Sequence, residues 1–179
     1  MLAAMTALAV IAACTNETDT PRESTDVQRI VSLAPNLTEL VYAVGAGDKL
    51  VGVSAWSDYP REVLELPIIG DAFTVDQEQL ALAKPDLLLV WESGTPQHVA
   101  DELRAIGYSV ASIKTRNLDD VAEALLTVGN LTGHSAQAES VAERYRAELS
   151  ALRDEYMHRE PIRVFYQVAA RPLYTINNE

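Results

Sequence analysis

The sequence is poor in cysteine, aromatic residues and basic residues. Of its 179 residues, one is cysteine and 6% are aromatic, and 14 Lys and Arg stand against 26 Asp and Glu, for a net charge of −12. The basic residues are scattered and form no stripe that would neutralise phosphates, which excludes nucleic acid as a partner. With a single cysteine no disulfide forms within the chain, so stability must come from a packed core.

Long hydrophobic runs are also missing. The run 8–13 (LAVIAA) is far shorter than the about 20 apolar residues that span a bilayer, but it has the length of a signal-peptide core. It ends as Ile-Ala-Ala-Cys at Cys14, which resembles the lipobox of bacterial lipoproteins, where the cysteine is acylated. We therefore expect a lipoprotein signal over 1–14 with lipidation at Cys14, then a polar, flexible tether over 15–28. A general secretory signal is the alternative, because no Lys or Arg precedes the run.

What the sequence does contain is an alternation of short apolar runs and longer amphipathic segments. This rhythm predicts an α/β fold, with a mostly parallel sheet and helices on both faces. The continuous run LLLV indicates a strand that is buried on both sides. The predicted strands are 29–33, 49–53, 87–91 and 108–113, and the predicted helices are 36–44, 75–83, 96–106 and 118–128.

The rhythm breaks over 135–158, where one long amphipathic segment predicts a single helix with an apolar stripe that runs from Val141 to Tyr156. After Pro161 a new strand is predicted over 162–168, and the sequence stops in what resembles the following loop. A strand that opens without a partner suggests that a second lobe begins here and is cut off.

Three motifs carry a resemblance to a known family. The segment SLAPNLTEL, with an extra Ala34 before the proline, the segment KPDL and the segment RVFYQVAARPLYT are similar to the substrate-binding proteins of ABC importers for vitamin B12, iron–siderophores and haem. The resemblance covers 29–175. The SDYP element after an aromatic residue is most typical of the cobalamin-type members.

The resemblance implies two α/β lobes joined by one long helix, with the ligand between the lobes. It places the N-terminal lobe at 29–132, the interlobe helix at 133–160 and the start of a truncated C-terminal lobe at 161–179. It further implies an exported, lipid-anchored monomer, periplasmic or at the cell surface, that delivers cobalamin or another corrinoid to an ABC permease in the inner membrane. No cofactor is expected, and membrane contact would be through the anchor alone. Haem or a ferric siderophore is the alternative ligand.

Two tryptophans and a tyrosine are the leading ligand-binding candidates. Trp56 and Tyr59 follow a predicted strand, and Trp91 ends another. By the resemblance Trp56 and Trp91 contact the ligand, and a corrin ring is a large amphipathic disc that suits rigid aromatic side chains. The alternatives are ordinary: Trp56 or Tyr59 holds its own loop against the lobe, and Trp91 covers the core.

The remaining candidates are weaker. Phe73 is a candidate in the next loop, although the family's aromatic position aligns with Ala72. Pro35 and Asn36 lie at the first turn between strand and helix, where backbone amides face the cleft, but Asn36 is also a good helix N-cap. By the resemblance, Glu78 pairs with arginines of the permease; otherwise it is a solvated helical glutamate.

Enzyme chemistry finds little support in the sequence. His98, His134 and His158 lie far apart, no Cys/His cluster has the spacing of a zinc site, and the serines lack a nucleophile-elbow motif. We expect no metal site and no catalytic residue. The different-class alternative is a lobe of an α/β enzyme whose catalytic residues lie elsewhere in the protein.

Overall fold

A parallel sheet forms the centre of the molecule. The computed structural model describes residues 27–71 and 73–175, and its main sheet has five strands in the order β3-β2-β1-β4-β5, all parallel. The strands are β1 (Ile30–Ser32), β2 (Leu50–Ser54), β3 (Ile68–Gly70), β4 (Leu87–Trp91) and β5 (Val110–Ile113). The predicted α/β class with a parallel sheet is therefore confirmed.

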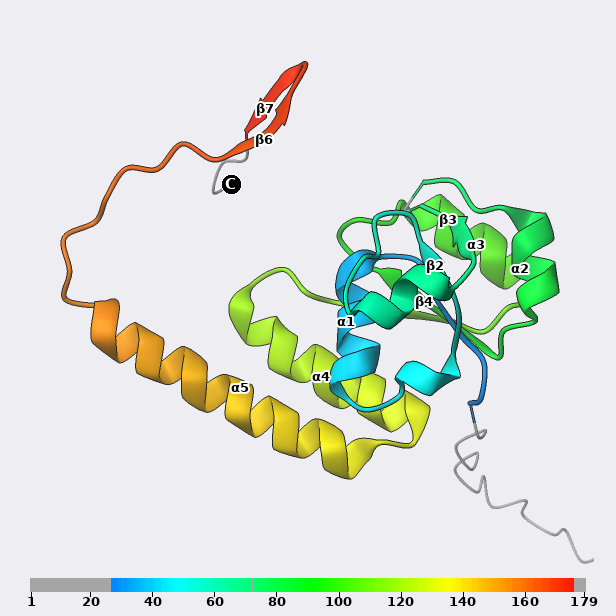
Figure 1. The fold of residues 1–179 in the computed structure, drawn as a ribbon, viewed down its shortest axis with the longest axis horizontal. Coiled ribbons are helices and arrows are strands. Elements are labelled where there is room, and N and C mark those ends of the chain that lie inside the picture. Colours follow the sequence, from blue (N-terminus) through cyan, green and yellow to red (C-terminus); the bar gives the residue numbers. More distant parts are fainter. Residues whose placement is uncertain (1–26, 72, 176–179) are drawn as a thin grey trace, which may run out of the picture.

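Helices cover both faces of the sheet (Figure 1). The helices α1 (Pro35–Ala43) and α4 (Leu118–Thr132) cover one face, and α2 (Gln77–Ala83) and α3 (Gln97–Ala105) cover the other. Strand β4 is apolar throughout because both of its faces are buried. Leu87 and Leu89 join the core beneath α1 and α4, while Leu88 and Val90 join the core beneath α2 and α3.

Side chains cap two of these helices. The carboxylate of Asp76 accepts hydrogen bonds from the backbone N–H groups of Glu78 and Gln79 at the start of α2, both at 3.0 Å. At the start of α4, Asn117 and Asp120 form a capping box in which each side chain accepts from the other's backbone N–H. Such caps satisfy amide groups that the first helical turn leaves free. The predicted helix over 75–83 therefore begins at Gln77.

The long helix α5 (Ser135–Tyr156) lies along α4 and continues beyond it (Figure 1). Its first half is anchored by buried Ala138, Val141 and Ala142, whereas every residue of 150–160 is exposed. The predicted helix over 135–158 is thus confirmed to within two residues. The apolar stripe, however, packs only near its beginning.

The predicted strand over 162–168 is wrong over 162–166, and a strand begins only at Gln167. In the structure 160–166 have no regular secondary structure, and a short antiparallel hairpin follows, made of β6 (Gln167–Ala170) and β7 (Leu173–Thr175). The side chains of Ile162, Val164 and Phe165 are exposed. Within the described residues no other strand lies beside this segment, so its apolar pattern has no sheet to join.

The sequence reading also missed three short elements and placed one boundary too late. Strand β3 and the two short 3₁₀ helices Gly47–Lys49 and Arg61–Glu65 were not predicted. The lobe begins before residue 29, because Val27 is buried and the N–H of Gln28 donates to the Asp86 carboxylate at 2.9 Å.

Candidate functional site

The candidate site lies at the carboxyl edge, a name we use for the sheet edge where all five parallel strands end. The strand order reverses between β1 and β4, since β2 and β3 lie on one side of this pair and β5 lies on the other. Open α/β sheets bind ligands in the crevice outside such a reversal. The loops that leave this edge begin at residues 33, 55, 71, 92 and 114.

The loop after β2 displays two aromatic side chains. Trp56 is 87% exposed and Tyr59 is 66% exposed. Trp56 lies in a tight turn in which the N–H of Ser57 donates to the carbonyl of Ser54 at 3.3 Å, and its φ angle is 68°. The indole therefore does not pack its loop against the lobe, which was the ordinary alternative for Trp56.

The loop after β3 displays a third aromatic side chain, that of Phe73, which is 70% exposed. Asp71 shapes this loop, because its carboxylate accepts from the N–H groups of Phe73 at 2.8 Å and Thr74 at 2.7 Å. Ala72, the family's aromatic position, lies outside the described residues. Three exposed aromatic side chains thus leave two neighbouring strands at one edge.

Trp91 behaves differently from Trp56. It ends β4, is partly buried and packs against the core beneath α1 and α4. Gly94 lies against the ring, and any side chain at that position would collide with it. The indole N–H is buried without a hydrogen-bond partner. Trp91 is therefore packed into the lobe at the carboxyl edge and does not project from it as Trp56 does.

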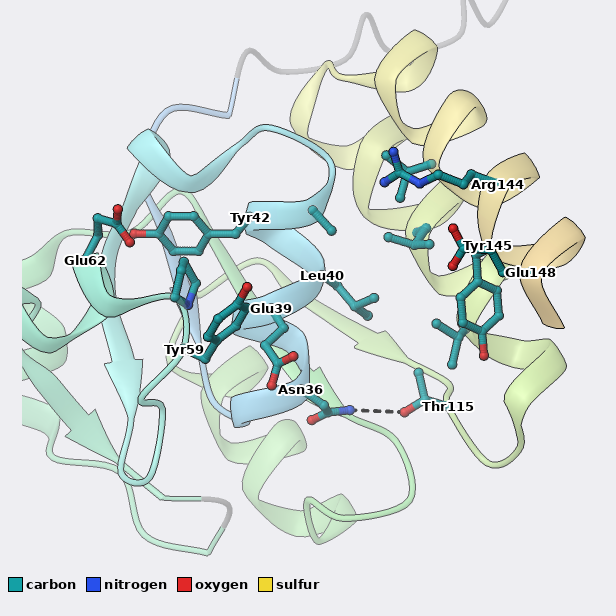
Figure 2. Close-up of a pocket in the computed structure, with 15 residues that line it drawn as sticks. Asn36, Glu39, Leu40, Tyr42, Tyr59, Glu62, Thr115, Arg144, Tyr145 and Glu148 are labelled. Carbon is teal, nitrogen blue, oxygen red and sulfur yellow. Dashed lines mark hydrogen bonds between the residues drawn. The ribbon is translucent and has the colours of Figure 1, made fainter. Parts of the chain in front are cut away.

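Pro35 and Asn36 open α1 next to the strand reversal, and both are partly buried. Asn36 is not the N-cap, since that position belongs to Ala34 and no side chain caps the helix. Pro35 occupies the first helical position, which moves Asn36 inside the first turn. The Asn36 amide instead donates to the hydroxyl of Thr115, beyond β5, at 3.2 Å (Figure 2).

Two charged residues at the edge were missed by the sequence reading. Arg116, after β5, forms an ion pair of 2.5 Å with Glu92, which follows β4. Both side chains are more than one-third exposed. The sequence carries a signal for them, because every strand of a parallel sheet delivers the residues that follow it to the same edge.

An open groove of 830 Å³ adjoins the carboxyl edge (Figure 2). The outer face of α1 forms one side, with Tyr59, Pro60 and Glu62 beside it, and α4 and α5 form the other. Its labelled lining residues are Asn36, Glu39, Leu40, Tyr42, Tyr59, Glu62, Thr115, Arg144, Tyr145 and Glu148. Of the predicted site residues that the structure describes, only Asn36 and Tyr59 line this groove.

In this region the pKa values of Tyr42, Asp119 and Asp120 depart from their ordinary values. Burial and the nearby Glu62 carboxylate raise the pKa of Tyr42 in the groove. At the start of α4, the backbone N–H of Arg116, the ammonium of Lys114 and other contacts lower the pKa of Asp120. The Arg153 guanidinium likewise lowers the pKa of Asp119, with which it forms a bidentate pair at 2.9 Å.

The other predicted positions lie apart from this edge or outside the described residues. Glu78 is exposed in the first turn of α2, and Cys14 belongs to the undescribed N-terminal residues. His98, His134 and His158 stay apart, and over 27–71 and 73–175 no group of three His, Cys, Asp or Glu side chains is placed to hold a metal. Among these same residues no helix is long and apolar enough to cross a membrane.

Comparison with known proteins finds binding proteins for vitamin B12 and for heme. The Vibrio cholerae serotype O1 vitamin B12-binding protein is 37% identical over 149 residues, which are 83% of this chain and 54% of that protein. The crystal structure of the periplasmic vitamin B12 binding protein BtuF of Vibrio cholerae matches with a TM-score of 0.79 and 36% identity, over 84% of this chain and 59% of that one. A periplasmic heme binding protein from Pseudomonas aeruginosa matches at 0.65 and 30%, over 72% and 46%.

The matches also show how much of each relative this chain covers. The chain spans about half the length of the curated relatives it matches, whose names are those of binding proteins and not of enzymes. The family model described as periplasmic binding protein matches residues 30–178. The chain belongs to the periplasmic binding protein family.

Proposed function

We propose that this chain supplies the N-terminal lobe of the substrate-binding protein of an ABC importer, and that its ligand is cobalamin or another corrinoid. The observation that carries the proposal is the row of exposed aromatic side chains, Trp56, Tyr59 and Phe73, at the carboxyl edge. They stand in a chain that is 37% identical to a vitamin B12-binding protein. No bond is made or broken in this role: the protein captures the ligand and releases it to a permease.

The chemistry of the edge suits a corrin ring. Trp56 and Phe73 offer wide apolar faces, and aromatic side chains lose little conformational freedom when they are covered. Trp91, held beneath Gly94, would form a rigid floor, and Pro35 and Asn36 would bring the start of α1 to the rim. The Arg116–Glu92 pair adds polar groups that match the amide side chains of a corrinoid.

Two further assignments belong to the transport role. Cys14 would carry the lipid that anchors the exported protein, and Glu78 would pair with an arginine of the permease. Glu78 is suited to docking, because it is exposed at the start of α2 and points away from the packed core. Charged groups at the rim of an interface set orientation and association rate.

Haem or a ferric siderophore is the second candidate ligand. The match to a heme binding protein favours it, because that chain reaches 30% identity over 72% of this one. An iron ligand calls for a coordinating or ionic side chain, and Tyr59 and Arg116 are exposed groups of that kind at the edge. A corrinoid instead calls for aromatic walls.

Calorimetric titration of the whole gene product that carries this chain separates the candidates. Cyanocobalamin, dicyanocobinamide, haemin and a ferric hydroxamate would be titrated separately into the protein without its lipid signal. The proposal expects tight binding of the two corrinoids alone. Binding of haemin or the hydroxamate alone would identify an iron ligand instead of a corrinoid. No binding at all would contradict the transport role.

A further inference from the structure

Four hydroxyl groups form a connected cluster beneath the Trp56 turn. They belong to Ser32 at the end of β1, Thr38 in α1, Ser54 at the end of β2, and Ser57, and none is more than 9% exposed. The Thr38 hydroxyl donates to that of Ser32 at 2.9 Å, and Ser32 donates to the Ala34 carbonyl at 3.0 Å. The Ser57 hydroxyl lies 3.3 Å from that of Thr38 and 3.2 Å from that of Ser54.

One direction of donation satisfies all four groups. If Ser54 donates to Ser57, Ser57 donates to Thr38 and Thr38 donates to Ser32, each hydroxyl gives one hydrogen bond and the relay ends on the Ala34 carbonyl. Connected hydroxyls polarise one another, and a fully satisfied buried network rigidifies the segments it joins. This network joins β1, α1 and β2 at the strand reversal.

The turn above the network needs such a restraint. Trp56 has φ 68°, a conformation that bulky side chains rarely adopt, and its side chain is 87% exposed, so packing does not hold it there. Two backbone bonds flank it, from Ala55 N–H to the Gly70 carbonyl at 2.6 Å and from Ser57 N–H to the Ser54 carbonyl at 3.3 Å. Residues in uncommon backbone regions persist where their surroundings determine them, and they gather at ligand contacts.

We propose that Thr38 and Ser57 are positioning residues that hold the Trp56 turn in its displayed conformation before the ligand arrives. The proposal rests on the proposed function for its consequence, which is tighter ligand binding. Pre-organisation raises affinity because ligand binding no longer has to order the loop. Thr38 acts from within α1 and does not itself touch the ligand.

The first test needs no ligand. The chain has two tryptophans. With Trp91→Phe, and with any tryptophan elsewhere in the gene product also replaced by phenylalanine, time-resolved fluorescence anisotropy reports the motion of Trp56 alone. Thr38→Val removes one hydroxyl of the network, and Ser57→Ala removes another. Thr132→Val is the matched control, because Thr132 is also buried in a helix and its hydroxyl, like that of Thr38, lies within hydrogen-bond distance of the carbonyl four residues earlier.

The expected result is a larger fast component of anisotropy decay in Thr38→Val and Ser57→Ala, an unchanged decay in Thr132→Val, and recovery in Thr38→Ser. Unchanged Trp56 motion in both network variants would overturn the proposal whatever the ligand. Equal loosening in Thr38→Val and Thr132→Val would also overturn it, because general destabilisation would then explain the effect. If one network variant fails to fold, the other decides.

The second test is affinity for cyanocobalamin, measured with Trp91 intact. Thr38→Val and Ser57→Ala should raise the Kd by about three- to tenfold, the scale of one hydrogen bond, while Thr132→Val and Thr38→Ser leave it unchanged. Looser Trp56 with unchanged Kd would overturn the positioning role. If the parent protein binds no corrinoid, the proposed function fails, and the anisotropy comparison still decides whether the network holds the turn.

Discussion

Trp56 and Trp91 show how two residues of one type take different roles at one sheet edge. Trp56 is displayed by a turn with positive φ, whereas Trp91 is set into the core beneath Gly94. The sequence indicated that both lie at strand ends, because each follows an apolar run. It did not distinguish display from burial, since that depends on turn geometry and on which face of β4 the last residue takes. The contacts of Thr115 and Arg116 were not predicted for a related reason, because each joins segments that are distant in sequence.

At Trp56 we predict a large effect on affinity and a small effect on folding. Trp56→Ala should raise the Kd for cyanocobalamin about tenfold or more, because aromatic anchors carry most of the energy of a contact. Its free energy of unfolding should change by less than about 0.5 kcal/mol, because the side chain is exposed. Calorimetry and urea unfolding measure the two quantities. Leu82→Ala, an exposed position on α2, is the control, and equal affinity in the two variants would contradict the assignment.

At Asp120 we predict a loss of stability in acid. Hydrogen bonds from the Arg116 N–H and the Lys114 ammonium lower the pKa of this carboxyl below its ordinary 3.8. The folded state therefore favours the ionised form. This stabilisation is present above the ordinary pKa and is lost as the pH falls through it towards the lowered value.

The test compares urea unfolding at about pH 6 with that at about pH 3.5. The parent protein should lose more stability between the two conditions than Asp120→Asn does, and Asp154→Asn, an exposed position on α5, should behave as the parent. An identical pH dependence in Asp120→Asn and the parent would contradict the role given to Asp120.

Among the elements, those with strong local signals were predicted and those defined by distant partners were not. Strand β4 and the helices α1 to α5 follow apolar periodicity, caps and glycines within their own segments. Strand β3 is only Ile68–Gly70, and among the described strands β2 alone pairs with it along its length. The apolar pattern of 162–168 predicted a strand. A strand forms only where a partner offers hydrogen bonds, and here that pairing begins at Gln167.

The contact between α4 and α5 yields a prediction about one glycine. Gly129 is buried in α4, and a Cβ there would collide with the side chain of Ala138 in α5. Although alanine favours a helix over glycine by about 1 kcal/mol, the collision should dominate. Gly129→Ala should therefore lower the free energy of unfolding, by about 1 to 3 kcal/mol for the overpacking.

Urea unfolding of a double variant provides the control for Gly129→Ala. Combining it with Ala138→Gly removes the opposing Cβ, so the pair should lie closer in stability to the parent than the sum of the single variants predicts. Strict additivity of the two changes would show that the helices do not meet at this point.

At the scale of the whole molecule, α5 is the feature that one lobe does not explain. Residues 150–156 are exposed and touch α4 through the Arg153–Asp119 pair, and the apolar side chains of Leu152 and Tyr156 are 55% and 48% exposed. A helix that projects beyond its own lobe suits a connection to further structure. The break in strand–helix rhythm predicted one long helix here, and the connecting role is what the family resemblance implies.

Glu78 yields a prediction about transport. Glu78→Arg should leave cyanocobalamin affinity unchanged, because α2 is capped independently by Asp76, but should reduce ligand delivery to the permease by reversing the docking charge. Uptake of labelled cobalamin by cells that carry each variant measures this. Glu102→Arg, an exposed position on α3, is the matched control, and equal uptake in the two variants would remove Glu78 from the interface.

The central claim, that the carboxyl edge holds a corrinoid, is tested most directly by hydrogen–deuterium exchange with and without saturating cyanocobalamin. We predict slower exchange in the loops 55–59, 71–75 and 92–95, with little change along α5 and along the groove face of α1 beyond its first turn. Protection confined to that groove face, or no protection of the three loops at saturation, would contradict the account.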